Sequence, residues 1–525
     1  MSAPGGREET LQILQQERFD VLVIGGGATG VGVCLDAASR GLRTALVEQG
    51  DFGCGTSSAA TKLIHGGIRY LELALRHLDL GQLRLVTGAL GERHVLRRLA
   101  PHLVRPLELV LPVTGLTQAA YYGAGLGAYE ALAWRRQLGP LQYLRPAAMR
   151  ARFGALRQRL GGWSFCEAQF DDARLALAIA QTAQVHGAVL ANAISVTALL
   201  KDHGRVVGAE VQDMHGGGPP FVIQARCVVN ATGAAVDTIR RMDDPQCEPL
   251  VSASIGVHAV YKAPWMPADS GFVVPRTADG RVLFVLPWLG HMLVGTTDEP
   301  WPHGRPPVVE DHALDYLDEQ VKPYFPIEEL SPTAVWAGIR PLLRHDGQHR
   351  TALLSREHAI EASRGGLLTV AGGKWTTYRL MARDTVDRVL VMLGMAPVPC
   401  RTATLPLLGG EHFRAADGLA LVGSGLEPDI VEHLHWTYGD RAEQVAALAR
   451  SGFAPRLAPG YPYIEAEVLW ATRHEWALSA EDCLYRRMRL GFIDQAATQV
   501  ARPRVEALLQ ECGAAPVRVI QATSS

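Results

Sequence analysis

The first fifty residues predict a strand, a tight turn, a helix and a second strand, because small residues separate their apolar runs. Residues 19–24 are apolar except at Asp20, as expected of a parallel strand that is buried on both faces. A glycine-rich stretch follows, then a helix-like segment that ends at Gly41, and then a second apolar run at residues 44–47. The preceding residues 1–18 are expected to be a polar leader.

The rest of the chain predicts further strands and then a helical end. Asp171 and Asp172 provide an N-cap and a first-turn charge for a helix from Ala173 to about His186. The alternation between residues 250 and 370 is typical of an antiparallel sheet. Strand-like runs lie at residues 189–199, 206–211, 221–229, 282–286, 292–294 and 367–370. After residue 400 the segments read as helices of a separate domain, at residues 429–436, 440–451, 464–476, 479–488 and 496–512.

The composition is that of a globular protein with more than one domain. The chain has 525 residues, of which 48% are hydrophobic, and a formal net charge of −2. Because the charge is balanced and no zinc-finger, recognition-helix or stacking motif occurs, we expect no nucleic-acid partner. The eight cysteines form no CxxC pair, so we expect neither a metal site nor a disulfide framework.

Two features bear on the location of the protein. The N-terminus contains acidic residues and lacks an apolar core, and no stretch reaches the about 20 apolar residues of a membrane-spanning helix, so a cytoplasmic protein is expected. Residues 135–159 contain seven arginines and no acidic residue, and they follow the apolar residues 119–134. Such a segment can be a solvated cationic face beside a core helix, or it can lie on an anionic bilayer surface.

The glycine-rich stretch has the spacing of a dinucleotide-binding turn. Gly25 permits the turn, Gly27 lets a pyrophosphate approach the backbone at the helix N-terminus, and Gly30 lets the helix pack close to the strand. Glu48 follows the second strand at about the 20-residue distance from which a carboxylate accepts hydrogen bonds from a ribose. The complete unit predicts that a dinucleotide binds here.

A second motif indicates which dinucleotide this is. Residues 56–72 read TSSAATKLIHGGIRYLE, which resembles the TSS-x-x-(S/T)KLIHGG-x-RYLE signature of the FAD-dependent glycerol-3-phosphate dehydrogenase family. The resemblance extends from Phe19 to about Asp494. It implies an α/β fold of the FAD-binding, two-dinucleotide-binding or D-amino acid oxidase-like type, with an antiparallel substrate-binding sheet. Residues 19–399 would hold the FAD-binding and substrate-binding parts interleaved, and residues 400–525 would form a helical C-terminal cap domain.

By the same resemblance, three further segments besides the glycine-rich turn would contact FAD. The turn at Gly372 and Gly373 precedes a predicted helix from Lys374 to about Leu393, whose positive end would stabilise negative charge on the reduced flavin. The further candidates for contact with the cofactor are Thr56, Ser57, Ser58 and Lys62 in the signature, and Gly233 after the strand that ends in Asn230-Ala231-Thr232.

Cationic residues and two histidines are the candidates for catalysis. Arginine binds phosphate through charge-assisted, bidentate hydrogen bonds, and imidazole has a pKa near working pH. The residues that match the family motifs are Arg69, Arg340 and Lys374 for the phosphate and the developing carbonyl, and His65 and His258 for the base. The sequence does not decide which of the two histidines is the base. The strand before His258 also lacks the lysine that the family pattern carries there.

The resemblance implies an aerobic, quinone-linked dehydrogenase of the bacterial type. The chain has no cysteine-rich tail and no calcium-loop pattern, and it is short for an oxidase with the extra inserted segment. The expected reaction oxidises sn-glycerol 3-phosphate to dihydroxyacetone phosphate by hydride transfer to N5 of FAD, and passes the electrons to a membrane quinone. The expected location is cytoplasmic, with peripheral contact to the inner (cell) membrane surface, and a homodimer is one candidate assembly.

Two alternatives stay open at this point. The first is a related flavoprotein oxidase or dehydrogenase that acts on an amino or hydroxy acid and uses the cations for a carboxylate. The second is a non-catalytic flavoprotein module.

Overall fold

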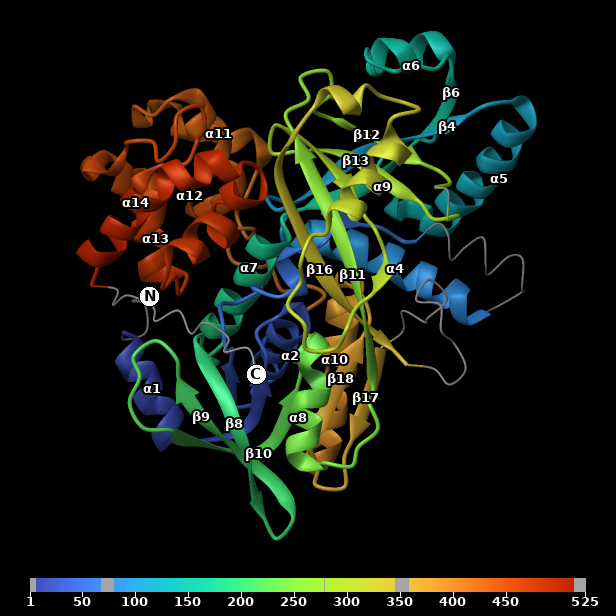
Figure 1. Cartoon of the computed structure of the whole chain (residues 1–525). Coiled ribbons are helices and arrows are strands. Elements are labelled where there is room, and N and C mark those ends of the chain that lie inside the picture. Colours follow the sequence, from blue (N-terminus) through green and yellow to red (C-terminus); the bar gives the residue numbers. More distant parts are fainter. Residues whose placement is uncertain (1–5, 68–79, 278, 345–357, 514–525) are drawn as a thin grey trace.

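The computed structural model describes residues 6–67, 80–277, 279–344 and 358–513, which form two sheets and a group of C-terminal helices (Figure 1). The strands next to one another at the centre of the first, eight-stranded sheet run parallel. In order across this sheet, the strands are β17 (His358–Ala362), β18 (Leu368–Gly372), β10 (Phe221–Asn230), β1 (Arg18–Ile24), β2 (Thr44–Val47) and β7 (Val189–Ala191), and β9 (Arg205–Asp213) and β8 (Ile194–Asp202) extend it from β10.

Helices cover both faces of this sheet, as the apolar character of its strands predicts. One face packs against α2 (Ala28–Ser39), α7 (Asp172–Val185) and α10 (Tyr378–Met392). The other face packs against α1 (Arg7–Gln16) and α8 (Val236–Asp243). The strand, turn, helix and strand predicted at the start of the chain are therefore confirmed, and so is the α/β class of the fold.

Helix α1 lies within the residues that the sequence describes only as a polar leader. Leu14 is fully buried among apolar residues of the sheet. Arg7 donates to the backbone oxygen of Asn192 at 2.9 Å and forms an ion pair with Asp213 at 2.7 Å. The sequence prediction missed this docked helix because so short a segment with few apolar residues gives a weak periodic signal.

The second sheet has ten strands among the described residues and is mostly antiparallel. The antiparallel pairing expected for residues 282–286 and 292–294 is confirmed. In order, the strands are β15 (Glu299–Pro300), β11 (Val251–Tyr261), β14 (His291–Gly295), β13 (Leu283–Trp288), β12 (Ser270–Val274), β4 (Val104–Val113), β6 (Gly161–Phe170) and β3 (Leu63–Ile64), with β16 (Pro332–Leu343) paired to β11 and β5 (Gln142–Leu144) to β6.

Four helices lie around the second sheet. Figure 1 shows α5 and α6 at the upper right, on the side of the molecule away from the C-terminal helices. The four are α4 (Leu80–Leu99), α5 (Leu116–Ala133), α6 (Pro146–Arg152) and α9 (Asp311–Val321). Within the described ranges, no helix combines the length and the apolar character that crossing a membrane requires.

The C-terminal part is helical, as predicted, and its helices group at the upper left of Figure 1. They are α11 (Pro428–Tyr438), α12 (Ala442–Leu448), α13 (Glu465–His474) and α14 (Gln495–Glu511). The segment at residues 479–488, predicted as a helix, contains a π-helical turn at Asp482–Arg487. In that turn, Arg486 and Arg487 form ion pairs with the buried carboxylate of Asp51, which follows β2.

Candidate active site

The carboxyl ends of four parallel strands bring most of the predicted cofactor residues to one edge of the first sheet. Gly25 directly follows β1, and Glu48 directly follows β2. Gly233 lies just after β10, and Gly372 ends β18. Ligands of doubly wound sheets bind outside this edge.

The turn after β1 has space for backbone only. Gly25 has a φ of +106°, and a Cβ there would lie 2.7 Å from the carbonyl oxygen of Ala231 at the end of β10. A Cβ on Gly30 would overlap the carbonyl oxygen of Gly25. Gly27 is the N-cap of α2, and only the Ser57 hydroxyl lies near the place of its missing side chain. That hydroxyl accepts a hydrogen bond from Ala28 N–H at 2.9 Å. This cradle fits the pyrophosphate of a dinucleotide.

Glu48 is fixed at the end of β2. Its two carboxylate oxygens accept hydrogen bonds from the backbone N–H groups of Gly26 at 2.6 Å and Gly50 at 2.8 Å. Burial raises the pKa of Glu48, and these two hydrogen bonds oppose that rise. The carboxylate is therefore oriented beside the glycine turn, as a ribose-binding acidic residue needs to be.

One face of the second sheet carries two of the predicted catalytic residues, His258 and Arg340. His258 on β11 pairs with Gly295 on β14 and with Trp336 on β16, and Gly295 pairs in turn with Phe284 on β13. Residues paired directly across strands place their side chains on the same face. The ring of His65, which follows β3, lies 6.3 Å from the ring of Phe284. Both candidate bases therefore lie along this row.

The environment of His258 keeps its ring neutral. The imidazole stacks on Trp336 with ring centroids 4.0 Å apart, and its Nε2 lies 3.0 Å from the hydroxyl of Thr61. Burial, followed by the nearby charges of Lys62 and Arg340, lowers the pKa of His258 well below its ordinary value. A neutral imidazole can accept a proton.

Arg340 extends from the same face of the sheet. Arg340 on β16 pairs with Ser254 on β11. The next pair on this face is Gly256 and Gly338, which lies between the Arg340 pair and the pair of His258 and Trp336. A Cβ on Gly256 would overlap the guanidinium of Arg340, so this glycine provides the space that the side chain occupies. The guanidinium donates to Asp298 Oδ1 at 3.0 Å and to the Thr296 hydroxyl at 2.9 Å.

The loop that contains Thr56, Ser57 and Ser58 lies between the cradle and this face. Thr56 donates to the carbonyl of Ile339 on β16. A Cβ on Gly338 would lie 2.9 Å from the carbonyl oxygen of Ala59. The indole N–H of Trp375 donates to the Ser57 carbonyl at 2.9 Å, which brings the segment after Gly373 and Lys374 next to the same loop. The predicted cofactor residues and the predicted catalytic residues thus meet across this loop.

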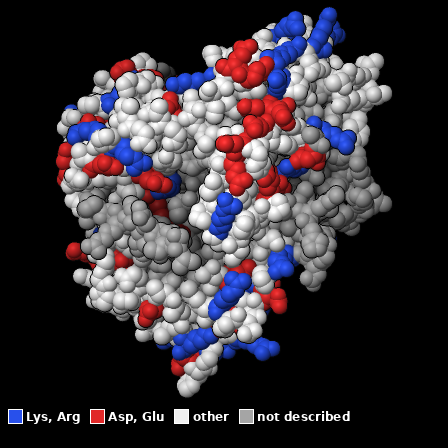
Figure 2. Space-filling view, in the orientation of Figure 1, with Lys and Arg blue, Asp and Glu red and all other residues white. Residues whose placement is uncertain are grey.

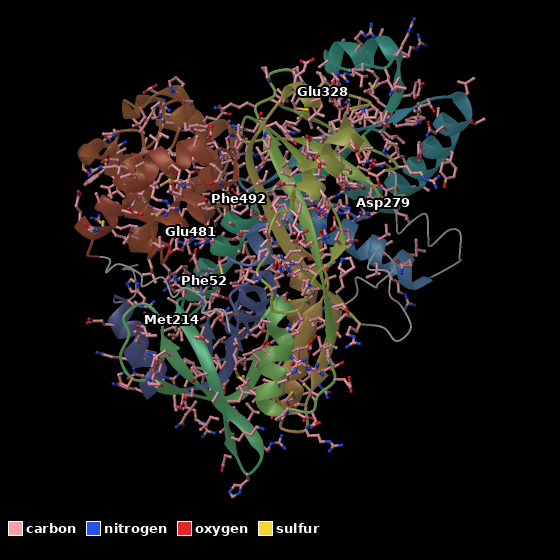
Figure 3. The ribbon with its side chains drawn as sticks, in the orientation of Figure 1. Phe52, Met214, Asp279, Glu328, Glu481 and Phe492 are labelled. Carbon is pink, nitrogen blue, oxygen red and sulfur yellow. The ribbon has the colours of Figure 1, made fainter. Side chains whose placement is uncertain are left out.

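Lys62 lies deeper than the other candidates. Its ammonium donates to Asp172 at 2.6 Å and to the carbonyl of Ser58 at 2.8 Å, and it is fully buried. Burial lowers the pKa of Lys62 to about 7. It also lies 4.6 Å from the centroid of the Trp336 ring and 5.2 Å from that of Phe492, which Figure 3 labels where the C-terminal helices approach the strands.

Arg489 of the C-terminal domain completes this buried cluster. Its guanidinium donates to Asp172 Oδ1 at 2.9 Å and to the Ser58 carbonyl at 2.8 Å. Asp172 also accepts a hydrogen bond from Ala60 N–H at 2.9 Å. We call Lys62, Asp172 and Arg489 the loop clamp, because all three hold residues 58–60.

Some site residues were not predicted, and some predictions stay open. Arg69 lies outside the described residues. The contacts of Lys62 and the other candidates with FAD or substrate stay predictions. Sequence reasoning placed Asp172 only at a helix start and gave Trp336 no role, because a lone tryptophan in a strand carries no signal. The signal for Arg489 was its occurrence in the arginine-rich Arg486-Arg487-Met488-Arg489 run.

Comparisons with known proteins identify the class. The family model described as FAD dependent oxidoreductase matches residues 20–379, and the model described as C-terminal domain of alpha-glycerophosphate oxidase matches residues 400–515. The chain therefore belongs to the family of FAD-dependent oxidoreductases, and FAD is its cofactor.

Whole-chain relatives narrow this class to the glycerol-3-phosphate dehydrogenases, the group that the signature predicts. The chain is 42% identical to the probable mitochondrial glycerol-3-phosphate dehydrogenase of Caenorhabditis elegans over 530 residues, 98% of this chain and 73% of that protein. The Homo sapiens mitochondrial enzyme is 40% identical over 526 residues, which cover 96% and 72% of the two chains.

Solved structures agree with this result. The glycerol-3-phosphate dehydrogenase from Bacillus halodurans, complexed with FAD, superposes with a TM-score of 0.74 at 26% identity, over 98% of this chain and 99% of that one. A glycine oxidase from Geobacillus kaustophilus shares the fold, with a TM-score of 0.53 at 22% identity over 75% and 99% of the two chains.

Proposed function

We propose that the protein oxidises sn-glycerol 3-phosphate to dihydroxyacetone phosphate and passes the electrons to a membrane quinone. The observation that carries this proposal is the single sheet face that presents His258 and Arg340 toward the loop of the FAD cradle. The names of the relatives support the same substrate. When bound, FAD supplies the acceptor for the hydride that leaves C2.

In this proposal the cations of the chain bind and orient the substrate. Arg340 is already oriented by Asp298 and Thr296, so its positive charge can attract a phosphate with little loss of side-chain entropy. Lys374 follows the turn at Gly372 and Gly373 and begins the segment that contacts Ser57 through Trp375. It would stabilise negative charge at the carbonyl that forms at C2, and Arg69 would add a third positive charge.

A histidine would take the proton of the C2 hydroxyl. The ring of His258 is neutral and is oriented by its hydrogen bond to Thr61, whereas its lowered pKa opposes proton uptake. The row of paired residues continues from His258 through Gly295 to Phe284, and the ring of His65 lies beside the ring of Phe284. Each imidazole is a candidate base, and separate His258→Gln and His65→Gln variants decide between them by the rate of flavin reduction.

We also propose that the protein lies on the cytoplasmic surface of the inner membrane through α5 and the segment after it. Leu116 is 87% exposed and Trp134 is 73% exposed. Arg135, Arg145 and Arg150 are exposed nearby, and Figure 2 shows lysine and arginine side chains gathered at the top of the view, over α6. Exposed apolar residues beside arginines suit an anionic bilayer surface.

Vesicle binding tests this surface. Leu116→Ser combined with Trp134→Ser should reduce co-sedimentation with phosphatidylglycerol vesicles at least about tenfold. The matched control is Val391→Ser, since Val391 is an exposed apolar residue on α10 at 67% exposure. Equal binding of both variants would contradict the proposed surface.

We further propose a boundary near residue 400 between the interleaved FAD-binding and substrate-binding parts and the helical C-terminal domain. The two separate family matches, which end at residue 379 and begin at residue 400, support this division.

Turnover with a soluble quinone analogue tests the proposed reaction. Purified protein loaded with FAD is supplied with sn-glycerol 3-phosphate, glycerol, glycine, proline or lactate, and the product is identified. The proposal expects turnover with the phosphate ester alone. Turnover with an amino or hydroxy acid would favour that oxidase class instead, and stable FAD without any turnover would favour a non-catalytic module.

A further inference from the structure

The turn that carries His65 rests directly on a tyrosine of α5. This turn follows β3 and consists of His65, Gly66 and Gly67. The N–H group of Gly66 donates to the phenol oxygen of Tyr129 at 2.8 Å. A Cβ on Gly66 would lie 2.5 Å from the same oxygen, so the backbone approaches the phenol as closely as glycine allows.

Tyr129 is held from its other side by a buried ion pair. Its hydroxyl donates to Glu167 on β6. Glu167 forms an ion pair with Arg93 of α4 at 2.5 Å, and Arg93 also donates to the carbonyl of Cys166 at 3.1 Å. Tyr129 and Arg93 are fully buried, and Glu167 is nearly so. Three elements of the fold therefore converge on one phenol.

The direction of these hydrogen bonds is fixed. Burial, followed by the charge of Glu167, raises the pKa of Tyr129 well above its ordinary value, so the phenol keeps its proton. With its one proton directed to Glu167, the oxygen can only accept from Gly66. The network runs from Arg93 through Glu167 and Tyr129 to the backbone beside His65, and each member has a defined role.

This network lies next to the row of side chains that faces the FAD cradle. The ring of His65 contacts the ring of Phe284, which shares the sheet face of His258. Moving the Gly66 backbone would therefore move His65 relative to that face.

We propose that Tyr129 is a positioning residue of the reaction, which acts through the Gly66 N–H group to set the place of His65. This inference rests on the proposed function, because it assigns His65 to the half-reaction in which substrate reduces the flavin. The inference predicts that Tyr129 has no role in the return of electrons to the quinone.

The test compares both half-reactions of holoenzyme variants. Tyr129→Phe removes the oxygen and nothing else, and Tyr121→Phe is the matched control, because Tyr121 lies on the same helix and is 51% exposed. Flavin reduction by sn-glycerol 3-phosphate is followed anaerobically across pH 6–9, and reoxidation by a quinone analogue is followed separately.

We expect Tyr129→Phe to reduce flavin at least about tenfold more slowly at saturating substrate, with a displaced pH profile. Its FAD content and its reoxidation rate should stay within about twofold of the unmodified protein, as should every property of Tyr121→Phe. A merely structural role would change both half-reactions together. Unchanged flavin reduction, or equal slowing of both half-reactions, would overturn the inference.

A second variant keeps the test decisive if Tyr129→Phe does not fold. Glu167→Asp keeps the charge that pairs with Arg93, but it shortens the side chain and so weakens the hydrogen bond from the phenol. We expect it to slow flavin reduction alone, and an unchanged rate would overturn the inference. Failure of the proposed function is distinct, because the unmodified protein would then leave its flavin oxidised.

Discussion

Replacing Asp172 by Asn should destabilise the protein more than any other isosteric substitution in the loop clamp. Asp172 contacts two buried cations, Lys62 at 2.6 Å and Arg489 at 2.9 Å. The carboxamide has nearly the same size, so the variant leaves the Arg489 guanidinium in place without this counter-charge, and Lys62 loses the partner that favours its charged form. Removing one partner of a buried ion pair costs about 3–5 kcal/mol.

The loss should appear both in the melting temperature and in the cofactor. For a protein of this size about 3–5 kcal/mol corresponds to a decrease of about 3–5 °C. Because Asp172 also accepts the Ala60 N–H group, the loop with Thr56 and Ser57 should shift, and the flavin content should fall. Differential scanning fluorimetry and the ratio of flavin to protein absorbance measure the two effects.

The neighbouring carboxylate provides the control. Asp171 caps α7 by accepting from Arg174 N–H at 3.0 Å, and asparagine is an equally good N-cap. Asp171→Asn also loses a longer contact with Arg489, 3.6 Å from its Nε, and should therefore change stability by about 1 kcal/mol, less than Asp172→Asn. Equal melting temperatures of the Asp171→Asn and Asp172→Asn variants would refute the idea that the loop clamp holds these elements together.

Three further changes probe the cradle, the substrate site and the loop clamp. Gly30→Ala should abolish FAD retention, because its Cβ would overlap the carbonyl oxygen of Gly25. Gly55→Ala should retain FAD, because no atom lies within 4 Å of the place of its Cβ. The visible absorbance of the purified variants measures the bound FAD. Arg340→Lys should raise KM for sn-glycerol 3-phosphate about tenfold or more, since lysine cannot bind a phosphate bidentately, and an unchanged KM would contradict that role. The pKa of Lys62 is lowered to about 7 in the folded protein, so above that pH the unfolded chain binds more protons than the folded chain. Stability should therefore rise with pH between about 7 and 10. Lys62→Met should remove this rise in melting temperature.

Local structure was predictable wherever one short segment determines it. The second strand occupies residues 44–47 as predicted, because a strand buried on both faces must be continuously apolar. The predicted roles of Gly25 and Gly30 agree with contacts within the same βαβ unit and its neighbouring strand. The helical segment predicted at residues 479–488 is present, but its π-helical turn at Asp482–Arg487, whose arginines pair with the distant Asp51, was not predictable from the segment alone.

The supporting contacts of the site were beyond sequence reasoning. Asp172 and Arg489 are 317 residues apart, and only the fold places the C-terminal domain against the cofactor loop. Tyr129 and Glu167 each lie in an otherwise unremarkable helix or strand. Single-sequence patterns indicate which residues are buried, but they do not indicate which buried polar groups meet.

Anaerobic mixing of the FAD-loaded protein with sn-glycerol 3-phosphate tests the central claim most directly. The visible absorbance of the flavin is followed after mixing, with glycerol as the control that lacks the phosphate. Rapid bleaching by the phosphate ester alone is the result that this account predicts. Persistent flavin absorbance with FAD fully bound would contradict it.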